Sequence, residues 1–241
     1  MESQLLGSTN ASEEAPYDAK APELYSSRVW STPVVRADWN RGSLRLCRQA
    51  AHAVLAAALL LGLFPLVVLI ALAVKATSRG PVLFKQLRVG EGGREFWLYK
   101  FRSMVVDAEA RRVQLAPLNE ASGPLFKIRN DPRVTPVGRV LRKFSLDELP
   151  QFLNVVKGDM VLIGPRPALP AEAAQYTPRQ RARLSAPPGI TGLAQVSGRS
   201  DLPFEKCVDL DLYFIEHWSP VLDLRIFVRT IAVVITGRGA Y

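Results

Sequence analysis

The stretch AAHAVLAAALLLGLFPLVVLIALAV, residues 50–74, decides what kind of protein this sequence encodes. It contains no Asp, Glu, Lys or Arg, and a helix over it would measure about 37 Å at the α-helical rise, enough to cross a bilayer. The stretch begins too far from Met1 for a secretory signal peptide and has no clear cleavage site. We therefore expect it to remain in the mature protein as a membrane segment.

Pro65 interrupts this apolar stretch. A proline inside a helix lacks the backbone donor, leaves the carbonyl of Leu61 without its intrahelical partner, and favours a kink. The break predicts two helical pieces of about 22 Å and 14 Å, each shorter than the ~30 Å hydrocarbon core of a bilayer.

Basic residues flank the stretch on both sides. They are Arg41, Arg45 and Arg48 before it and Lys75, Arg79, Lys85 and Arg88 after it. Because cytoplasmic flanks of membrane segments carry the excess of Lys and Arg, we expect both ends on the cytosolic side. A re-entrant helix that breaks at Pro65 and dips into one leaflet satisfies both observations. An ordinary kinked helix that spans the bilayer is the open alternative.

The overall composition favours an acidic partner. The 241 residues carry a formal net charge of +9, and 48% of them are hydrophobic. This surplus suits nucleic acid, anionic lipid or a phosphorylated small molecule, and charge alone does not choose among them. The two cysteines and two histidines stand in no disulfide or metal-ligand spacing, which fits a reducing, cytosolic environment.

Short strands and helices are expected after the membrane segment. Residues 81–89 and 94–104 are β-rich, and the glycine-rich residues between them predict a hairpin. The remaining pattern predicts helices over 107–116 and 146–156, a loop over 117–136, an extended run over 160–163, and two C-terminal helices divided at Ser219 and Pro220. An apolar stripe of Leu222, Ile226, Ile231 and Val234 suits either a membrane interface or the domain core.

Two adjacent acids, Asp147 and Glu148, lie in RKFSLDELPQFLNVVKGDM, residues 142–160. Ser145 and Glu148 match the capping box of a helix start, which is a structural explanation. The helix N-terminus and the nearby Arg142 should also keep Asp147 ionised at neutral pH. An ionised aspartate among cations can attack phosphorus, with Mg²⁺ held by carboxylate and phosphate oxygens. The local sequence leaves both explanations open.

Two later segments are candidates for ligand contact. Arg166 stands between Pro165 and Pro167, so a stiff backbone either fixes a cation in place or forms a simple structural turn. Residues 186–201 are punctuated by glycines, which allow a close approach of the backbone to a ligand.

Taken together, these motifs resemble the bacterial sugar transferase family of monotopic phosphoglycosyl transferases, over nearly everything from residue 50 to residue 241. Five ordered elements carry the resemblance: KFRSM (100–104), RKFSLDELPQ (142–151), NVVKGDM (154–160), GPRP (164–167) and PGITG with the following Gln195 and Gly198-Arg199 (188–199).

The resemblance implies transfer of a hexose 1-phosphate from a UDP-sugar to polyprenyl (undecaprenyl) phosphate, with release of UMP, as the priming step of exopolysaccharide, O-antigen or glycan synthesis. It implies that Asp147 is the nucleophile, carries a covalent phosphosugar and binds Mg²⁺, and that Glu148 assists the metal or deprotonates the acceptor. Contacts to phosphate or substrate are implied for Lys100, Arg102, Arg142, Arg166, Gln195 and Arg199.

The resemblance also implies the fold and the location. The expected fold class is a monotopic, membrane-associated α+β protein with a re-entrant anchor, a small β-hairpin, catalytic helices and interfacial amphipathic helices. We expect a flexible extension (1–43), a re-entrant membrane helix (44–78) and a catalytic domain (79–241) on the cytoplasmic face of the bacterial inner membrane, in contact with membrane lipid.

A non-enzymatic alternative is a membrane-tethered module that binds anionic lipid or nucleic acid through its basic surface. It predicts strongly salt-dependent binding and no need for either carboxylate. No stretch of the sequence resembles a nucleic-acid-binding motif, so we expect no nucleic-acid partner.

Overall fold

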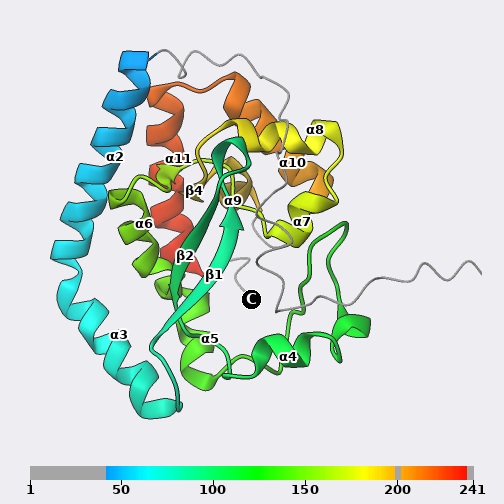
Figure 1. Cartoon of the computed structure of the whole chain (residues 1–241). Coiled ribbons are helices and arrows are strands. Elements are labelled where there is room, and N and C mark those ends of the chain that lie inside the picture. The colour runs from blue at the N-terminus through cyan, green and yellow to red at the C-terminus, as the bar shows by residue number, and fades with distance from the viewer. Residues whose placement is uncertain (1–41, 199–201, 238–241) are drawn as a thin grey trace, which may run out of the picture.

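The computed structural model describes residues 42–198 and 202–237 (Figure 1). It is a mixed α+β structure, mostly helical, with one long apolar helix and two small sheets. The flexible extension expected over residues 1–43 lies outside the described residues, except for Gly42 and Ser43, which begin the first helix.

The elements follow one another as short helices and strands. The helical segments are α2 (Gly42–Gly62), α3 (Phe64–Thr77), η2 (Glu91–Gly93), α4 (Ala108–Arg112), η3 (Ala116–Leu118), α5 (Pro136–Lys143), η4 (Leu146–Gln151), α6 (Phe152–Val156), α7 (Pro170–Ala174), α8 (Pro178–Arg181), η5 (Ala182–Ser185), α9 (Leu193–Ser197), α10 (Phe204–Glu216) and α11 (Pro220–Thr236), where η marks 3₁₀ geometry. The strands are β1 (Leu83–Val89), β2 (Glu95–Phe101), β3 (Val161–Ile163) and β4 (Gly189–Thr191).

The predicted break in the apolar stretch is confirmed. Leu63 separates α2 from α3, and Pro65 is in the first turn of α3, where its missing N–H costs least. Backbone bonds continue on both sides of the break, from Leu63 N to Leu59 O and from Val67 N to Leu63 O, each at 2.9 Å. The chain therefore bends at this point without losing its helical bonding elsewhere.

The prediction that both pieces are too short to cross a bilayer is wrong for α2. This helix has 21 residues, which corresponds to about 31 Å, because it begins at Gly42 rather than at residue 50. Among the described residues it is the one helix long and apolar enough to cross a membrane, and α3 is a shorter apolar helix. The long apolar helix indicates membrane association.

The predicted hairpin is also confirmed. β1 and β2 pair antiparallel from Leu83 opposite Phe101 to Val89 opposite Glu95. The turn needs its glycines, because Gly92 and Gly93 have φ values of 64° and 83°. The hairpin therefore has a fixed register, and Lys100 lies near the end of the sheet opposite to the turn.

The second sheet shows what two of the other glycines do. β3 and β4 pair parallel, and Gly164 N donates to Thr191 O at 2.8 Å just beyond the strand. A Cβ on Gly189 would lie 2.1 Å from Gly164 N. We expected such glycines to admit a ligand, but at these two positions they let one backbone segment approach another.

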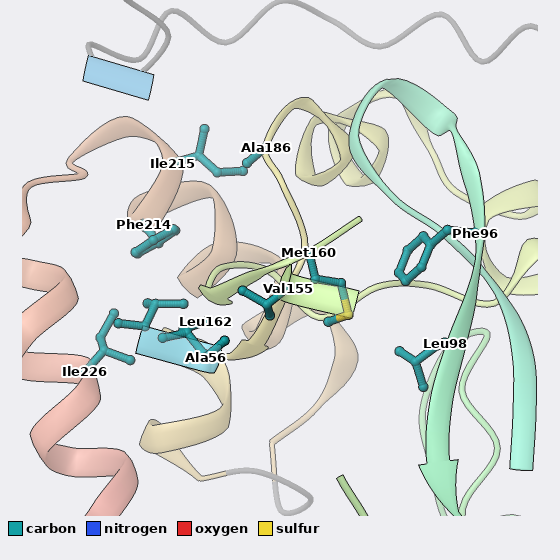
Figure 2. Close-up of a cluster of buried hydrophobic side chains, with 11 residues drawn as sticks. Ala56, Phe96, Leu98, Val155, Met160, Leu162, Ala186, Phe214, Ile215 and Ile226 are labelled. Atoms are coloured by element: carbon teal, nitrogen blue, oxygen red, sulfur yellow. The ribbon is translucent and has the colours of Figure 1, made fainter. Parts of the chain in front are cut away.

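The main core lies between β2, α6, β3 and the two C-terminal helices (Figure 2). Phe96 and Leu98 extend from β2 toward Met160 and Val155 in that view. Ala56 of α2 is fully buried in the same cluster, so one face of the long apolar helix belongs to the domain core. Its other face stays exposed, with the side chains of Val54, Leu55 and Leu61 in solvent.

Two of the expected helices differ in detail. Residues 146–156 begin as the 3₁₀ segment η4, which contains Pro150, and become α-helical only in α6. The helix expected over 107–116 is shortened to α4, followed by a turn. The loop expected after it is largely irregular apart from the short η3.

The C-terminal helices divide where expected, and Ser219 caps α11 by accepting a hydrogen bond from Leu222 N at 3.2 Å. Only half of the predicted stripe belongs to the core. Ile226 is 1% exposed and Leu222 packs against the core cluster, whereas Ile231 is 47% exposed. Ile231 instead shares a second, exposed apolar stripe with Val221, Leu224, Val228 and Ile235.

Candidate active site

The acid pair lies on η4, which is packed between β2, α5 and α6. Leu146 and Leu149, on either side of the acids, pack against the cluster that contains Ile70 and Val74 of α3. The cluster also contains Phe101 and Leu141. The leucines on either side of the acid pair are therefore anchored in the apolar cluster to which α3 contributes.

The predicted capping box is wrong. Ser145 adopts a left-handed backbone conformation with φ of 54°, and its side chain makes no capping hydrogen bond. A cap residue normally has extended geometry, whereas Ser145, one residue beyond the C-cap Phe144 of α5, has left-handed geometry. The Glu148 carboxylate pairs instead with the Lys100 ammonium on β2, with Nζ and Oε1 2.7 Å apart.

Asp147 is 7% exposed and accepts no side-chain hydrogen bond from any residue in the described ranges. Burial raises the pKa of its carboxyl above the ordinary value, while the positive charges of Lys100 and Arg142 act in the opposite direction. The sequence predicted that Asp147 is ionised at a helix end, but burial has a larger effect on its pKa than the neighbouring charges do. The cations are therefore needed to keep this carboxylate charged.

Arg88 is a member of the site that the sequence counted only as a flank of the membrane segment. It is 6% exposed on β1, and its Nη1 donates to Pro167 O at 3.0 Å. Burial and the neighbouring Arg166 lower the pKa of Arg88 to about 10, and Glu148 is close enough to act against this. An arginine between Leu87 and Val89 in a predicted strand was the signal for a buried cation.

Arg166 itself is exposed, while Pro165 and Pro167 on either side are buried. The backbone around it is held by Gly189 N, which donates to Pro165 O at 2.8 Å, and by the bond from Arg88. Arg166 also acts on the pKa of both Arg88 and Tyr176, so it lies near the two. The loop therefore holds the positive side chain of Arg166 near Arg88, which in turn lies near Glu148.

Arg102 does not join this group. It is 6% exposed, and its guanidinium donates to Arg79 O at 2.8 Å, Ser78 O at 2.9 Å and Ser78 Oγ at 2.7 Å. These bonds satisfy carbonyls at the C-terminal end of α3. The cation therefore ties the apolar helix to the hairpin, whereas the sequence placed it with Lys100.

Gln195 lies on α9 beside the loop that carries Arg166. A Cβ on Gly192 would approach both Gln195 Oε1, at 2.8 Å, and Gly164 O, at 2.3 Å. Oε1 of Gln195 is buried without a hydrogen-bond partner among the described residues. A buried acceptor of this kind usually has a donor, so a ligand group is a natural partner. Arg199, the last predicted contact, lies outside the described residues.

Comparison with known proteins shows clear relatives. The sequence model of a family described as "Bacterial sugar transferase" matches residues 43–237. The galactosyl transferase CpsE of Streptococcus agalactiae is 49% identical over 162 residues, which are 67% of this chain and 36% of that protein. An undecaprenyl-phosphate galactose phosphotransferase of Salmonella typhimurium is 44% identical over 166 residues, 67% of this chain and 35% of that protein.

A third relative matches over more of its own length. A UDP-glucose:undecaprenyl-phosphate glucose-1-phosphate transferase of Caulobacter vibrioides is 43% identical over 197 residues, 78% of this chain and 70% of that protein. The chain thus spans about a third of the length of the first two relatives and about two thirds of the third.

Proposed function

The chain belongs to the bacterial sugar transferase family, and on that premise we propose that it transfers a hexose 1-phosphate from a UDP-sugar to undecaprenyl phosphate. The names of two relatives support this substrate pair, because both act on undecaprenyl phosphate and one of them uses UDP-glucose. The proposed role is the priming step of exopolysaccharide or related glycan synthesis.

One observation carries the proposal. Asp147 is buried without a hydrogen-bonded side-chain partner in the described ranges, and Lys100 and Arg142 act on it as the nearby cations. Burial of this carboxylate outweighs its backbone hydrogen bond and the nearby cations, so it costs folding free energy, and chemistry is the natural reason for it. Cations beside it can offset the charge of an approaching diphosphate, which would otherwise repel the nucleophile.

In the first step, an Oδ of Asp147 attacks the β-phosphorus of the UDP-sugar. A bond forms between that oxygen and phosphorus, the bond from phosphorus to the bridging oxygen breaks, and UMP leaves with the electron pair. The sugar phosphate is then bound covalently to Asp147. We propose that Arg142 and Arg166 stabilise the charge on the phosphate oxygens during this step.

In the second step, a phosphate oxygen of undecaprenyl phosphate attacks the same phosphorus. The bond to Asp147 breaks, the carboxylate is restored, and the sugar is left on a polyprenyl diphosphate. Glu148 is the candidate to take a proton from the acceptor phosphate, and its carboxylate lies 2.7 Å from the Lys100 ammonium.

Mg²⁺ fits this donor set, because the ion takes one or two carboxylates and completes its shell with phosphate oxygens and water. Asp147, with Glu148 beside it, is the ligand we propose. Within residues 42–198 and 202–237 no group of three or more acidic, Cys or His side chains offers a complete protein cage. When bound, the ion would supply further positive charge to the diphosphate.

The three remaining predicted contacts, Gln195, Arg199 and Arg102, differ in how well the structure supports them. The buried acceptor of Gln195 supports a contact to the donor nucleotide, and we propose the same for Arg199. Arg102 is better supported as a positioning residue, since its described bonds go to the end of α3.

We propose that residues 44–78 form a re-entrant anchor and that residues 79–241 act on the cytoplasmic face of the bacterial inner membrane. The bend at Leu63 and the exposed apolar side chains of α2 and α3 support this arrangement. Exposed apolar side chains on α11 suit contact with the same lipid surface. Labelling of an N-terminal tag from outside intact cells tests the anchor, because a spanning helix would expose one end and a re-entrant helix neither.

The activity is tested with the full chain in lipid nanodiscs, Mg²⁺, undecaprenyl phosphate and a panel of UDP-glucose, UDP-galactose and UDP-N-acetyl sugars. We expect UMP release with one donor, and none with Asp147→Asn. Asp209→Asn is the control, since Asp209 is an exposed acid paired with Arg179. Undiminished turnover by the Asp147 variant would refute the nucleophile, and no release with any donor would refute the function.

A further inference from the structure

Asn154 is a buried polar side chain that the reaction as proposed does not use. It is 0% exposed on α6 and bonds the backbone of β2 through both ends of its amide. Nδ2 donates to Trp97 O at 2.7 Å, and Oδ1 accepts from Tyr99 N at 3.1 Å. The amide therefore takes the place of a neighbouring strand on the edge of β2 that β1 leaves free.

The same residue also holds the turn that follows α6. The main-chain carbonyl oxygen of Asn154 accepts from Asp159 N at 2.9 Å and from Met160 N at 3.3 Å. The side-chain Nδ2 is 3.4 Å from Asp159 Oδ2. Every polar atom of the side chain therefore has a partner. Fully satisfied buried networks of this kind specify one arrangement of the elements that they join.

The two elements that Asn154 joins carry opposite halves of the site. β2 presents Lys100 immediately after Tyr99, and α6 continues η4, which carries Asp147 and Glu148. Apolar contacts between two such elements would allow one to slide along the other. Hydrogen bonds to a strand do not, because its backbone N–H and C=O groups point to alternate sides from one residue to the next. A slip of one residue would turn the bonding groups of β2 away from Asn154.

We infer that Asn154 is a positioning residue that sets the register of Lys100 against the acid pair. Its effect on the reaction rests on the proposed function, whereas its effect on the strand does not. In the native register the Lys100 ammonium lies 2.7 Å from the Glu148 carboxylate. Without the amide, the lysine loses its fixed position beside the acid pair.

Asn154→Ala tests this, with Val155→Ala as the matched control. Val155 is the next residue and is 1% exposed, but it packs in the core and makes no side-chain bond to β2. We expect Asn154→Ala to lower kcat by about tenfold to a hundredfold with little change in KM for the UDP-sugar. Lys100→Met should lower kcat in the same way, because the inference has Asn154 act through this lysine.

The control should lose thermal stability to a similar degree while its kcat stays close to that of the unaltered protein. In Asn154→Ala/Lys100→Met the two losses of kcat should not add, because both act through the same lysine. An unchanged kcat in Asn154→Ala, or fully additive losses, would overturn the inference. If the alanine variant does not fold, Asn154→Ser, which can keep one of the two bonds, gives the same test.

A second measurement does not depend on activity. Hydrogen exchange of the full chain in nanodiscs should accelerate at the Tyr99 amide in Asn154→Ala and not in Val155→Ala. The Leu98 and Lys100 amides face β1 and should keep their protection in both. An unprotected Tyr99 amide in the unaltered protein would refute the contact even if the enzyme is active, whereas absent UMP release with every donor would refute only the proposed function.

Discussion

Asp147 and Asp223 are almost equally buried, with 7% and 8% of their surfaces exposed, yet their surroundings differ. Asp223 of α11 accepts from Arg48 Nε and from Trp218 Nε1, each at 2.9 Å. Asp147 accepts no side-chain hydrogen bond from the described residues, and the charges of Lys100 and Arg142 and a backbone hydrogen bond act on its carboxylate instead.

The difference separates a structural acid from a chemical one. Asp223 joins α11 to α2, and Arg48 of that pair also donates to Ile163 O at 2.7 Å at the end of β3. Its burial is offset by strong bonds, so its removal should cost stability. At Asp147 burial outweighs the compensation from the two cations and the backbone hydrogen bond, and its removal should cost activity instead.

The largest effect is expected for Asp147→Asn. Loss of the proposed nucleophile should lower turnover by at least about 10³-fold, or about 4 kcal/mol of transition-state stabilisation. Thermal stability should stay the same or rise, because a buried charge without a bonded partner is removed. UMP release and a thermal melt of one preparation check both halves. A large loss of stability in Asp147→Asn would mean that Asp147, like Asp223, has a structural role.

Asp223→Ala should have the next largest effect, on stability. It leaves the Arg48 guanidinium, whose side chain is 8% exposed, without its carboxylate, and such a change costs about 3–5 kcal/mol. Asp159→Ala is the control, because its partner Arg94 is 71% exposed and an exposed pair contributes less than about 1 kcal/mol. Equal shifts in Tm would contradict the contrast.

Glu148→Gln is expected to be milder. The pair with Lys100 is partly exposed, at 29% and 20%, and no capping box depends on Glu148, so the stability cost should stay below about 1 kcal/mol. Turnover should fall by about tenfold to a hundredfold, because the neutral amide cannot accept a proton. Initial rates and Tm are measured together, and a fall in Tm with an unchanged rate would indicate a purely structural role.

The smallest effect is a difference in pH dependence. Because burial raises the pKa of Asp147, the folded chain holds this proton more tightly than the unfolded chain does. The resulting stability is complete below the ordinary value of 3.8 and is lost as the pH rises through the folded-state pKa. The Tm advantage of Asp147→Asn should therefore grow from pH 4 to pH 8, whereas a constant difference would contradict it.

Local signals in the sequence predicted much of the fold. Pro65, the glycine turn of the hairpin and the Ser219-Pro220 division each act through their own backbone, and each is where the sequence predicts it. The exposed Arg166 between two buried prolines is of the same kind. Such features need no information about distant residues.

The parts that the sequence did not predict depend on long-range contacts. Ser145 and Glu148 fit a capping box locally, but the pairing of Glu148 with Lys100 across the fold prevailed. The sequence assigned Arg102 to the substrate site and Arg88 to a flank of the membrane segment, whereas the described bonds of Arg102 go to the end of α3 and Arg88 is buried against Pro167. The bonds of Asn154 to β2 join residues more than fifty positions apart, and no local pattern indicates them.

Leu146 and Leu149 pack against the apolar cluster that contains Ile70 and Val74 of α3. The length of this helix therefore affects the position of the acid pair. Its 14 residues correspond to about 21 Å, and in the proposed re-entrant arrangement this length sets how far the catalytic acids stand above the deepest point of the anchor. One extra helical turn would raise the reaction plane by about 5 Å relative to the lipid headgroups. In the proposed reaction, the length of α3 would set the acid pair at the level at which a carrier lipid presents its phosphate, and bilayers of different thickness would favour different lengths.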